Sequence, residues 1–327
     1  YLKYISSNDI HVYSIDEAFL DITSYLKLYN KTPIELAKLI ISSIYKETGI
    51  TATAGIGTNL YLAKMAMDII AKHNTSNIGY LDINLYKELL WHHTPMTDFW
   101  QIGKGIEARL NNLGIHNMHE VSKCDEKILY KEFGINAKLL IDHSLGIEPC
   151  TIKDIKSYKP KSTSISSGQV LFKNYDYINA RKVLIEMIDS SCLELVKKRV
   201  FANNIYLYIG YSKQEFYPLK ISRKLENPTN NYEQILNVFL EEYDKKINKN
   251  YSIKRINIGF GNLTHNCIEQ LNLFTDYDEN KNDFNLQKTM NLIKEKYGKN
   301  SILRCISLDE NATQILRNKL IGGHNAE

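Results

Sequence analysis

The chain has 327 residues, which is too long for one ordinary core, so two or three folded units are expected. With 43% hydrophobic and 24% charged residues the composition is that of a soluble globular protein, and no apolar run is long enough to cross a bilayer. This excludes a membrane role, and the absence of a secretory signal makes the cytoplasm the expected compartment. The net charge of +4 is too small to indicate a polyanionic partner by itself.

Residues 1–80 alternate between strand and helix patterns. Two runs with period-two alternation, 11–15 and 18–23, predict a strand pair whose connecting turn carries Asp16 and Glu17. The patterns that follow are a helix at 33–48 that stops at a glycine, a buried strand at 51–56, and a helix at 59–72. Such alternation predicts a sheet with helices covering one face.

The rest of the chain changes pattern several times. Residues 81–150 lack strand signals and predict a small helical module divided by glycines, and residues 151–162 are basic, without periodicity, and predict an exposed connector. Residues 163–262 return to alternating strands and helices, which indicates a second α/β unit of the split βαβ type. Residues 263–327 are polar and are expected to form a flexible tail with one amphipathic helix at 286–297. The predicted fold class is thus α+β and multidomain.

Asp16 and Glu17 are the first candidate site. At a hairpin tip both side chains can project from the same end of the sheet, although within a strand they would point to opposite faces. Two carboxylates this close repel each other unless a divalent cation neutralises them, and magnesium prefers such hard oxygen ligands. A pair of magnesium ions stabilises both the attacking and the leaving oxygen of a phosphoryl transfer. Taken alone, the pair is better explained as acidic residues that solvate a turn.

The residues around this pair carry a family resemblance. Residues 12–23 read VYSIDEAFLDIT and closely resemble the catalytic motif of the Y-family translesion DNA polymerases, the group that contains UmuC and DinB. Residues 51–57, TATAGIG, and 62–66, LAKMA, resemble the palm strand and the basic helix that follow it in this family. The resemblance spans nearly the whole chain and is closest to the UmuC-like Gram-positive branch.

The resemblance implies roles for four residues of this first unit. Asp16 and Glu17 would bind two Mg²⁺ ions and act as the catalytic carboxylates. Lys72 would hold the incoming triphosphate, which suits the mobile point charge of a lysine, with Lys64 in support. A lysine near the C-terminus of a helix is also favoured by the helix dipole without any ligand.

Two further segments resemble DNA-binding parts of the family. Residues 99–105, FWQIGKG, are similar to the helix-hairpin-helix of the thumb, although a glutamine replaces its first glycine. The resemblance implies that DNA phosphate binds at Gly103, Lys104 and Gly105. Residues 161–169, KSTSISSGQ, resemble the opening strand of the little finger domain. The DNA-backbone contacts implied there are Ser164, Ser166 and Ser167. A packing corner and a solvated strand are the alternatives without DNA.

Residues 270–274, QLNLF, resemble the peptide with which bacterial polymerases dock on the β sliding clamp. The implied clamp-binding residues are Gln270, Leu271, Leu273 and Phe274. Apolar side chains in an extended segment would enter a groove of the clamp, and tethering would raise the local concentration of the enzyme at the primer end. A tail strand that packs on its own domain is the alternative.

Together these resemblances imply a division into a palm remainder at 1–80, a helical thumb at 81–150, a linker at 151–162, a little finger at 163–262 and a tail at 263–327. The palm and the little finger would both contain ferredoxin-like sheets. The first strand of the family, with a further metal-binding aspartate, and the fingers are expected to precede Tyr1, so the chain is expected to be N-terminally truncated.

The function expected from the resemblance is DNA-directed DNA synthesis across lesions in DNA repair and the SOS response. The protein is expected to be a monomer, and its expected partners are primed DNA, deoxynucleoside triphosphates and the bacterial β sliding clamp. One alternative is a non-catalytic remnant that binds DNA and the clamp. Another is a nucleotide cyclase, which also presents carboxylates on a palm-like hairpin.

Overall fold

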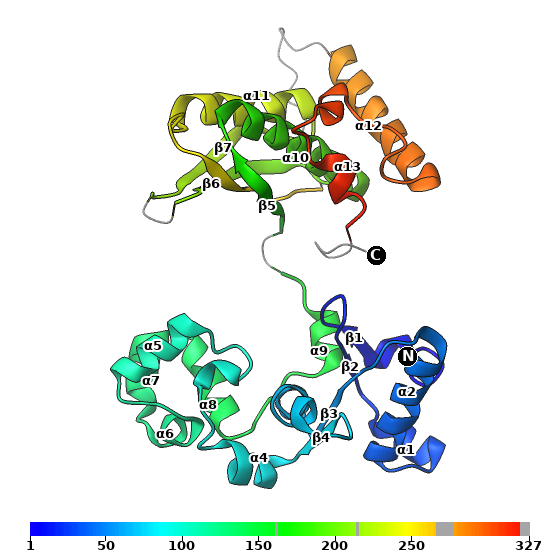
Figure 1. The fold of residues 1–327 in the computed structure, drawn as a ribbon, viewed down its shortest axis with the longest axis vertical. Helices are drawn as coiled ribbons and strands as arrows, with labels where there is room; N and C mark the ends of the chain where they lie inside the picture. Colours follow the sequence, from blue (N-terminus) through cyan, green and yellow to red (C-terminus); the bar gives the residue numbers. More distant parts are fainter. Residues whose placement is uncertain (161–162, 214–215, 266–276, 321–327) are drawn as a thin grey trace. The chain divides into compact units, whose positions relative to one another are not determined.

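The computed structural model describes residues 1–160, 163–213, 216–265 and 277–320. The chain divides into two compact units, Tyr1–Lys159 and Pro160–Glu327 (Figure 1). Each unit has its own apolar core. Both units combine helices with strands, which confirms the α+β fold class. Among the helices of the described ranges, none has the length and apolar character needed to span a membrane.

The elements of the first unit are β1 Ile10–Val12, β2 Ala18–Leu20, α1 Thr23–Tyr29, α2 Pro33–Thr48, β3 Ala54–Gly57, α3 Leu60–Met65, β4 Ile78–Leu81, α4 Ile83–Leu90, α5 Lys104–Asn112, α6 Met118–Lys123, α7 Glu126–Phe133, α8 Asn136–Ser144 and α9 Ile152–Ser157. Its four strands form two separate two-stranded sheets, β1 with β2 and β3 with β4.

The hairpin β1–β2 is confirmed, with Val12 opposite Ala18 in antiparallel register. Its second strand is shorter than the alternation predicts. It stops at Leu20 because Asp21 accepts a hydrogen bond from the N–H of Thr23 at 3.0 Å and the chain turns into α1, a helix that the pattern did not indicate.

Helix α2 begins and ends where its sequence predicts. The side chain of Thr32 accepts the N–H of Glu35, and the Glu35 carboxylate accepts the N–H of Thr32, which satisfies two amides of the first turn. Pro33 occupies the first helical position, and Gly49 closes the last turn in the left-handed conformation, with φ of 71°.

The second sheet is a parallel pair whose connection carries the basic residues. Strand β3 is followed by α3, by a short π-helix at Ala66–Ile70 and by a 3-10 turn at Ala71–His73. Strand β4 then returns parallel to β3. A Cβ atom at Gly55 or Gly57 would overlap backbone atoms of Ala63 on α3. These glycines therefore permit the close approach of helix and strand that places α3 over the sheet.

Helices α4 to α8 form the helical module expected from the sequence. Their apolar core is continuous with α3, since Leu62 and Met65 of α3 belong to the same buried cluster as Tyr86 of α4 and Leu110 of α5. The boundary placed at residue 81 therefore does not separate two cores.

The connector predicted at 151–162 needs correction. Residues Ile152–Ser157 form α9, which begins with a reciprocal cap between Thr151 and Asp154. The ammonium group of Lys156 donates to the backbone carbonyls of Ser7 and Asn8, so α9 is fixed to the first unit beside β1. Two local signals, the cap and the short apolar face, favour a helix here despite the basic composition.

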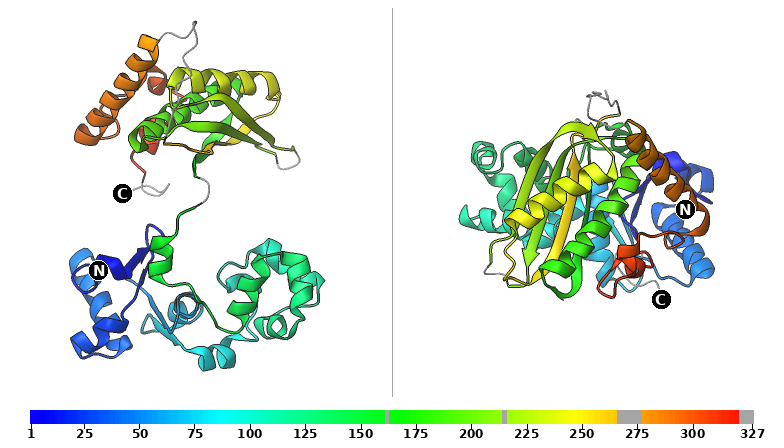
Figure 2. Two further views of the ribbon diagram at one scale, coloured as in Figure 1. Left: turned by 180° about the vertical axis from the view of Figure 1, so that it is seen from behind. Right: turned by 90° about the horizontal axis from the view of Figure 1, so that it is seen from above.

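The elements of the second unit are β5 Ser164–Tyr175, α10 Tyr177–Lys198, β6 Ala202–Tyr211, β7 Leu219–Thr229, α11 Tyr232–Lys246, β8 Ile253–Gly261, α12 Tyr277–Tyr297 and α13 Gln314–Arg317. The strands form one antiparallel sheet in the order β5-β8-β6-β7, with α10 and α11 over one face (Figure 2). The buried residues of both helices and all four strands make its core.

The expectation of a loosely attached tail is also corrected for the described residues after 281. Helix α12 packs against α10, and the guanidinium of Arg304 bonds Asp189 of α10 at 2.5 Å and lies 3.6 Å from the ring centroid of Tyr232. Polar residues carry these contacts, so hydropathy alone gave no sign of them.

Candidate active site

The tip of the β1–β2 hairpin carries the predicted carboxylates. The N–H groups of Tyr13 and Ser14 both donate to the carbonyl of Glu17, at 2.9 and 3.1 Å, and this closes the turn around Asp16. Asp16 is exposed, and its Oδ1 accepts a hydrogen bond from the Ser14 hydroxyl at 2.7 Å. That bond lowers the pKa of Asp16, and the positive charges of Lys64 and Lys72 add to the effect. Asp16 is therefore ionised and open to solvent.

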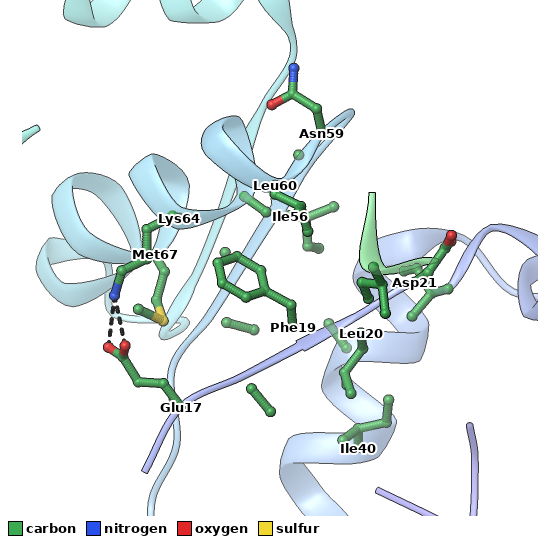
Figure 3. Close-up of a pocket in the computed structure, with 18 of the residues that line it drawn as sticks. Glu17, Phe19, Leu20, Asp21, Ile40, Ile56, Asn59, Leu60, Lys64 and Met67 are labelled. Carbon is green, nitrogen blue, oxygen red and sulfur yellow. Dashed lines mark hydrogen bonds and ion pairs between the residues drawn. The ribbon is translucent and has the colours of Figure 1, made fainter. Parts of the chain in front are cut away.

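Glu17 is bound by Lys64, which reaches it from α3. Both carboxylate oxygens of Glu17 accept hydrogen bonds from Lys64 Nζ, at 2.8 and 2.9 Å (Figure 3). The Lys64 side chain is only 9% exposed. Burial works to lower the pKa of Lys64, but the carboxylates of Glu17 and Asp68 outweigh it and the pKa is raised. Lys64 therefore stays charged at this site.

Asp68 joins the two predicted lysines. Its carboxylate lies 3.2 Å from Lys64 Nζ and 2.8 Å from Lys72 Nζ. Lys72 is half exposed and can leave this pair for another anion. The sequence analysis missed Asp68, although the spacing of one acidic residue four positions from each lysine was a readable signal.

A cavity of about 370 Å³ lies beside Glu17 and Lys64. Its walls include Phe19 from β2, Ile40 from α2 and Met67 after α3 (Figure 3). The largely apolar lining lowers the local dielectric, which strengthens the interaction of the Glu17–Lys64 pair relative to the same pair in water.

The hairpin is also fixed to the helical module. The indole N–H of Trp100 donates to the hydroxyl of Tyr13 at 2.9 Å, and the two rings meet edge to face with centroids 5.8 Å apart. Phe19 packs against the same indole at 5.9 Å. Trp100 thus links the hairpin that bears the carboxylates to the segment that precedes α5.

That segment holds the predicted thumb contacts. Gly103 is the N-cap of α5, and Lys104 and Gly105 start the helix, all three exposed. The N–H groups of a first helical turn have no intrahelical acceptor and are available to an anion. Gln101, in place of the family's glycine, adopts φ of 69°, the left-handed conformation that glycine usually supplies. A left-handed turn therefore forms at this position without glycine.

The structure separates the three predicted serines of the little finger. Ser164 and Ser166 are exposed on the face of the sheet opposite the helices, in a groove of about 700 Å³ that also includes Tyr206 and Lys220. Ser167 lies opposite the buried Ile258 of β8, on the face of the sheet that the helices cover. Alternation along a strand explains why neighbouring serines do not act together.

The predicted clamp-binding residues Gln270, Leu271, Leu273 and Phe274 lie outside the described residues.

Comparison with known proteins shows which family this chain matches. Residues 1–68 match the impB/mucB/samB family, and residues 162–273 match the C-terminal domain of that family. The chain is 29% identical to the putative UV-damage repair protein UvrX of Bacillus subtilis over 332 residues, which is 100% of this chain and 76% of that protein. It is 31% identical to DNA polymerase IV 2 of Bacillus subtilis over 330 residues, which is 96% of this chain and 75% of that protein.

A solved structure has the same fold. A Y-family DNA polymerase chimera of Dbh and Dpo4 superposes with a TM-score of 0.59 at 22% identity, covering 81% of this chain and 73% of the chimera. The family match removes the nucleotide cyclase alternative. The hairpin carboxylates, the helix that faces them and the relatives together show that the chain belongs to the Y family of DNA polymerases, which are DNA-directed DNA polymerases of DNA repair.

Proposed function

We propose that this protein carries out translesion DNA synthesis with Asp16 and Glu17 as its metal-binding carboxylates. The observation that carries the proposal is the pair itself: two carboxylates lie at one hairpin tip, faced by Lys64 of α3, and Lys72 follows in the 3-10 turn Ala71–His73. Negative groups for a cation and positive groups for phosphate oxygens thus lie within one site, which is what nucleotidyl transfer requires.

The donor chemistry fits magnesium. Within the described ranges, no three His, Cys, Asp or Glu residues gather into an all-protein metal site. Mg²⁺ keeps several waters and commonly takes one or two carboxylates together with substrate phosphates. When bound, two such ions would polarise the primer 3′-hydroxyl and neutralise charge on the leaving group. Asp16 is proposed to contact both ions, and Glu17 the ion near the primer end.

In the proposed reaction the primer 3′-oxygen forms a bond to the α-phosphorus of the incoming deoxynucleotide. The bond from that phosphorus to the bridging oxygen breaks, pyrophosphate leaves, and the hydroxyl proton passes to solvent. Lys72, which is half exposed, is proposed to exchange Asp68 for the triphosphate. Lys64, which pairs with Glu17 in this structure, adds a second positive charge to the site.

DNA is proposed to bind through backbone contacts. The exposed start of α5, at Gly103, Lys104 and Gly105, offers amides to a phosphate. On the little finger, Ser164 and Ser166 line the open groove of the sheet, where hydroxyls can donate to phosphate oxygens. Ser167 is no longer included, because it lies on the other face of the strand.

The remaining expectations stay part of the proposal. Residues 270–274 are proposed to dock on a bacterial β sliding clamp, and Phe274→Ala should weaken binding to a purified clamp without changing affinity for primed DNA.

We further propose that the protein is a monomer and acts in the cytoplasm during the SOS response. Increased survival of ultraviolet-damaged cells that express the protein, absent with Glu17→Gln, tests the cellular role.

Primer extension on a template with a single lesion tests the central proposal. The protein is expected to extend the primer with Mg²⁺, and Asp16→Ala and Glu17→Ala are each expected to lower the rate by roughly 100- to 1,000-fold, the equivalent of several kcal/mol of transition-state stabilisation. Glu47→Ala, which removes an exposed carboxylate of α2 paired with Lys3, is the control. Tight DNA binding without any incorporation would favour the non-catalytic alternative.

A further inference from the structure

Four charged side chains of alternating sign form a row of successive ion pairs at the site: Glu17, Lys64, Asp68 and Lys72. The distances between neighbours are 2.8 Å from Lys64 to Glu17, 3.2 Å from Lys64 to Asp68, and 2.8 Å from Lys72 to Asp68. Asp68 is the only one of these four residues that pairs with both lysines, and the proposed reaction uses it only as the partner that Lys72 leaves.

The position of Lys64 creates a conflict that Asp68 can resolve. Lys64 donates to both oxygens of Glu17, so a divalent cation bound to Glu17 would lie close to a like-charged ammonium group at the same two oxygens, and the two cations repel each other. Lys64 is too buried to exchange Glu17 for water, since an unpaired buried charge carries a large desolvation penalty. It needs a second carboxylate, and Asp68 already lies within ion-pair distance.

The local backbone puts Asp68 where it can serve both lysines. It is the middle residue of the short π-helix Ala66–Ile70, which interrupts the α-helical hydrogen bonding after α3. Short π-helical segments are uncommon, and they frequently occur at functional sites. Asp68 is about a quarter exposed, whereas Lys72 on its other side is half exposed. The carboxylate thus lies between a buried cation and a mobile one.

We propose that Asp68 is a positioning residue: it takes over the ammonium group of Lys64 when Glu17 binds a divalent cation, and it releases Lys72 to the nucleotide triphosphate. This inference rests on the proposed function, since it assigns Glu17 to the metal. It predicts that removing the charge of Asp68 leaves Lys64 with Glu17 as its sole anionic partner among these four residues, so that metal binds more weakly while Lys72 is freed.

Metal binding without turnover tests the proposal. Mn²⁺ affinity of the protein, measured by electron paramagnetic resonance in the absence of DNA and nucleotide, is expected to fall about tenfold in Asp68→Asn, as is typical when a group that orients a metal ligand is changed. Asp68→Glu keeps the charge and is expected to stay within about threefold of wild type. The KM for the incoming nucleotide should not rise in Asp68→Asn, because Lys72 loses a competing partner. A purely structural role would instead weaken metal and nucleotide binding together.

A matched variant controls for the loss of a lysine–aspartate pair. Asp142→Asn breaks the analogous pair of Lys138 and Asp142 on α8, whose carboxylate is 19% exposed, compared with 23% for Asp68. Mn²⁺ affinity should not change in this variant. A tenfold loss there, or equal losses in Asp68→Asn and Asp68→Glu, would overturn the proposal.

Lys64→Met keeps the test decisive even if Asp68→Asn fails to fold. Without the ammonium group Glu17 is free, so Mn²⁺ should bind more tightly, and adding Asp68→Asn to this background should have little further effect. Unchanged affinity in Lys64→Met contradicts the inference while leaving the proposed function intact. Unchanged affinity in Glu17→Gln instead contradicts the assignment of the metal site itself.

Discussion

Asp16 and Glu17 are neighbours in the sequence, but the structure gives them different surroundings. Asp16 is exposed and bonded to Ser14, whereas Glu17 is bound by a buried lysine. A cation can reach Asp16 from solvent, while at Glu17 it must compete with Lys64. The two carboxylates are therefore expected to differ in how strongly they depend on the residues around them.

At the same scale, His143 in the helical module predicts a pH dependence of stability. Its ring is stacked on Tyr61 at 4.0 Å between centroids, and Nε2 lies 3.0 Å from a carboxylate oxygen of Glu148. Burial lowers the pKa of His143, and the opposing effect of Glu148 is smaller. Because the folded-state pKa is below that of the unfolded chain, the unfolded chain binds the proton more readily and stability falls as the pH drops below about 6.5.

This prediction is checked by urea unfolding at about pH 7.5 and about pH 5.5, on either side of the usual histidine pKa. The wild-type protein should lose more stability on acidification than His143→Gln. An equal loss in both proteins would mean that other groups cause the acid sensitivity.

At the scale of elements, the approach of α3 to β3 depends on glycine. Gly57→Ala should destabilise the first unit by about 1–3 kcal/mol, because the new methyl group overlaps helix backbone and not a movable side chain. Gly105→Ala is the matched control, since a Cβ there meets no atom within 4 Å. Thermal unfolding should separate the two, and an unchanged melting temperature in Gly57→Ala would contradict the packing described for this helix.

The docking of the C-terminal segment also depends on one residue. The carboxylate of Glu186, 2% exposed on α10, accepts the N–H groups of Thr313 at 2.8 Å and Gln314 at 3.2 Å, and so caps α13. Glu186→Ala leaves the buried N–H of Thr313 unpaired, at about 1–3 kcal/mol, and removes the acceptor of the half-buried N–H of Gln314. We expect faster amide hydrogen exchange across α13 with unchanged exchange in β6. Glu186→Gln, which keeps one acceptor, should give an intermediate effect, and unchanged exchange in both variants would refute this docking.

The sequence predicted those elements whose signals are local. Helix α2 has its proline, its reciprocal cap and its final glycine within the segment itself, so both ends were placed correctly. The docked C-terminal segment was missed because its contacts, such as that of Thr313 with Glu186, join residues distant in the chain. The helices α1 and α9 and the strands β4 and β7 were also missed, although α9 has a local signal in the cap formed by Thr151 and Asp154.

For the candidate site, the motif identified the carboxylates and the lysines but not their connections. The Lys64–Glu17 bond joins residues 47 positions apart, and no periodicity indicates it. Alternation along β5 did contain the information that separates Ser167 from Ser164 and Ser166, and the sequence interpretation overlooked it.

At the scale of the whole molecule, two separate apolar cores predict independent folding. Every member of the larger buried cluster lies between Ile165 and Phe260. Residues 160–327 expressed alone should therefore unfold cooperatively on heating, with a far-ultraviolet circular dichroism spectrum of mixed helix and strand. A broad transition without cooperativity would show that the second unit depends on the first.

The central claim is that the hairpin carboxylates perform template-directed nucleotidyl transfer. Its most direct test is the single-turnover rate of incorporation of one nucleotide opposite each of the four template bases, for wild type and Glu17→Gln at saturating DNA. The account predicts Mg²⁺-dependent incorporation of the complementary nucleotide by wild type and a rate roughly 100-fold or more lower in Glu17→Gln with DNA affinity unchanged. Incorporation by Glu17→Gln at the wild-type rate, or incorporation that ignores the template base, would contradict it.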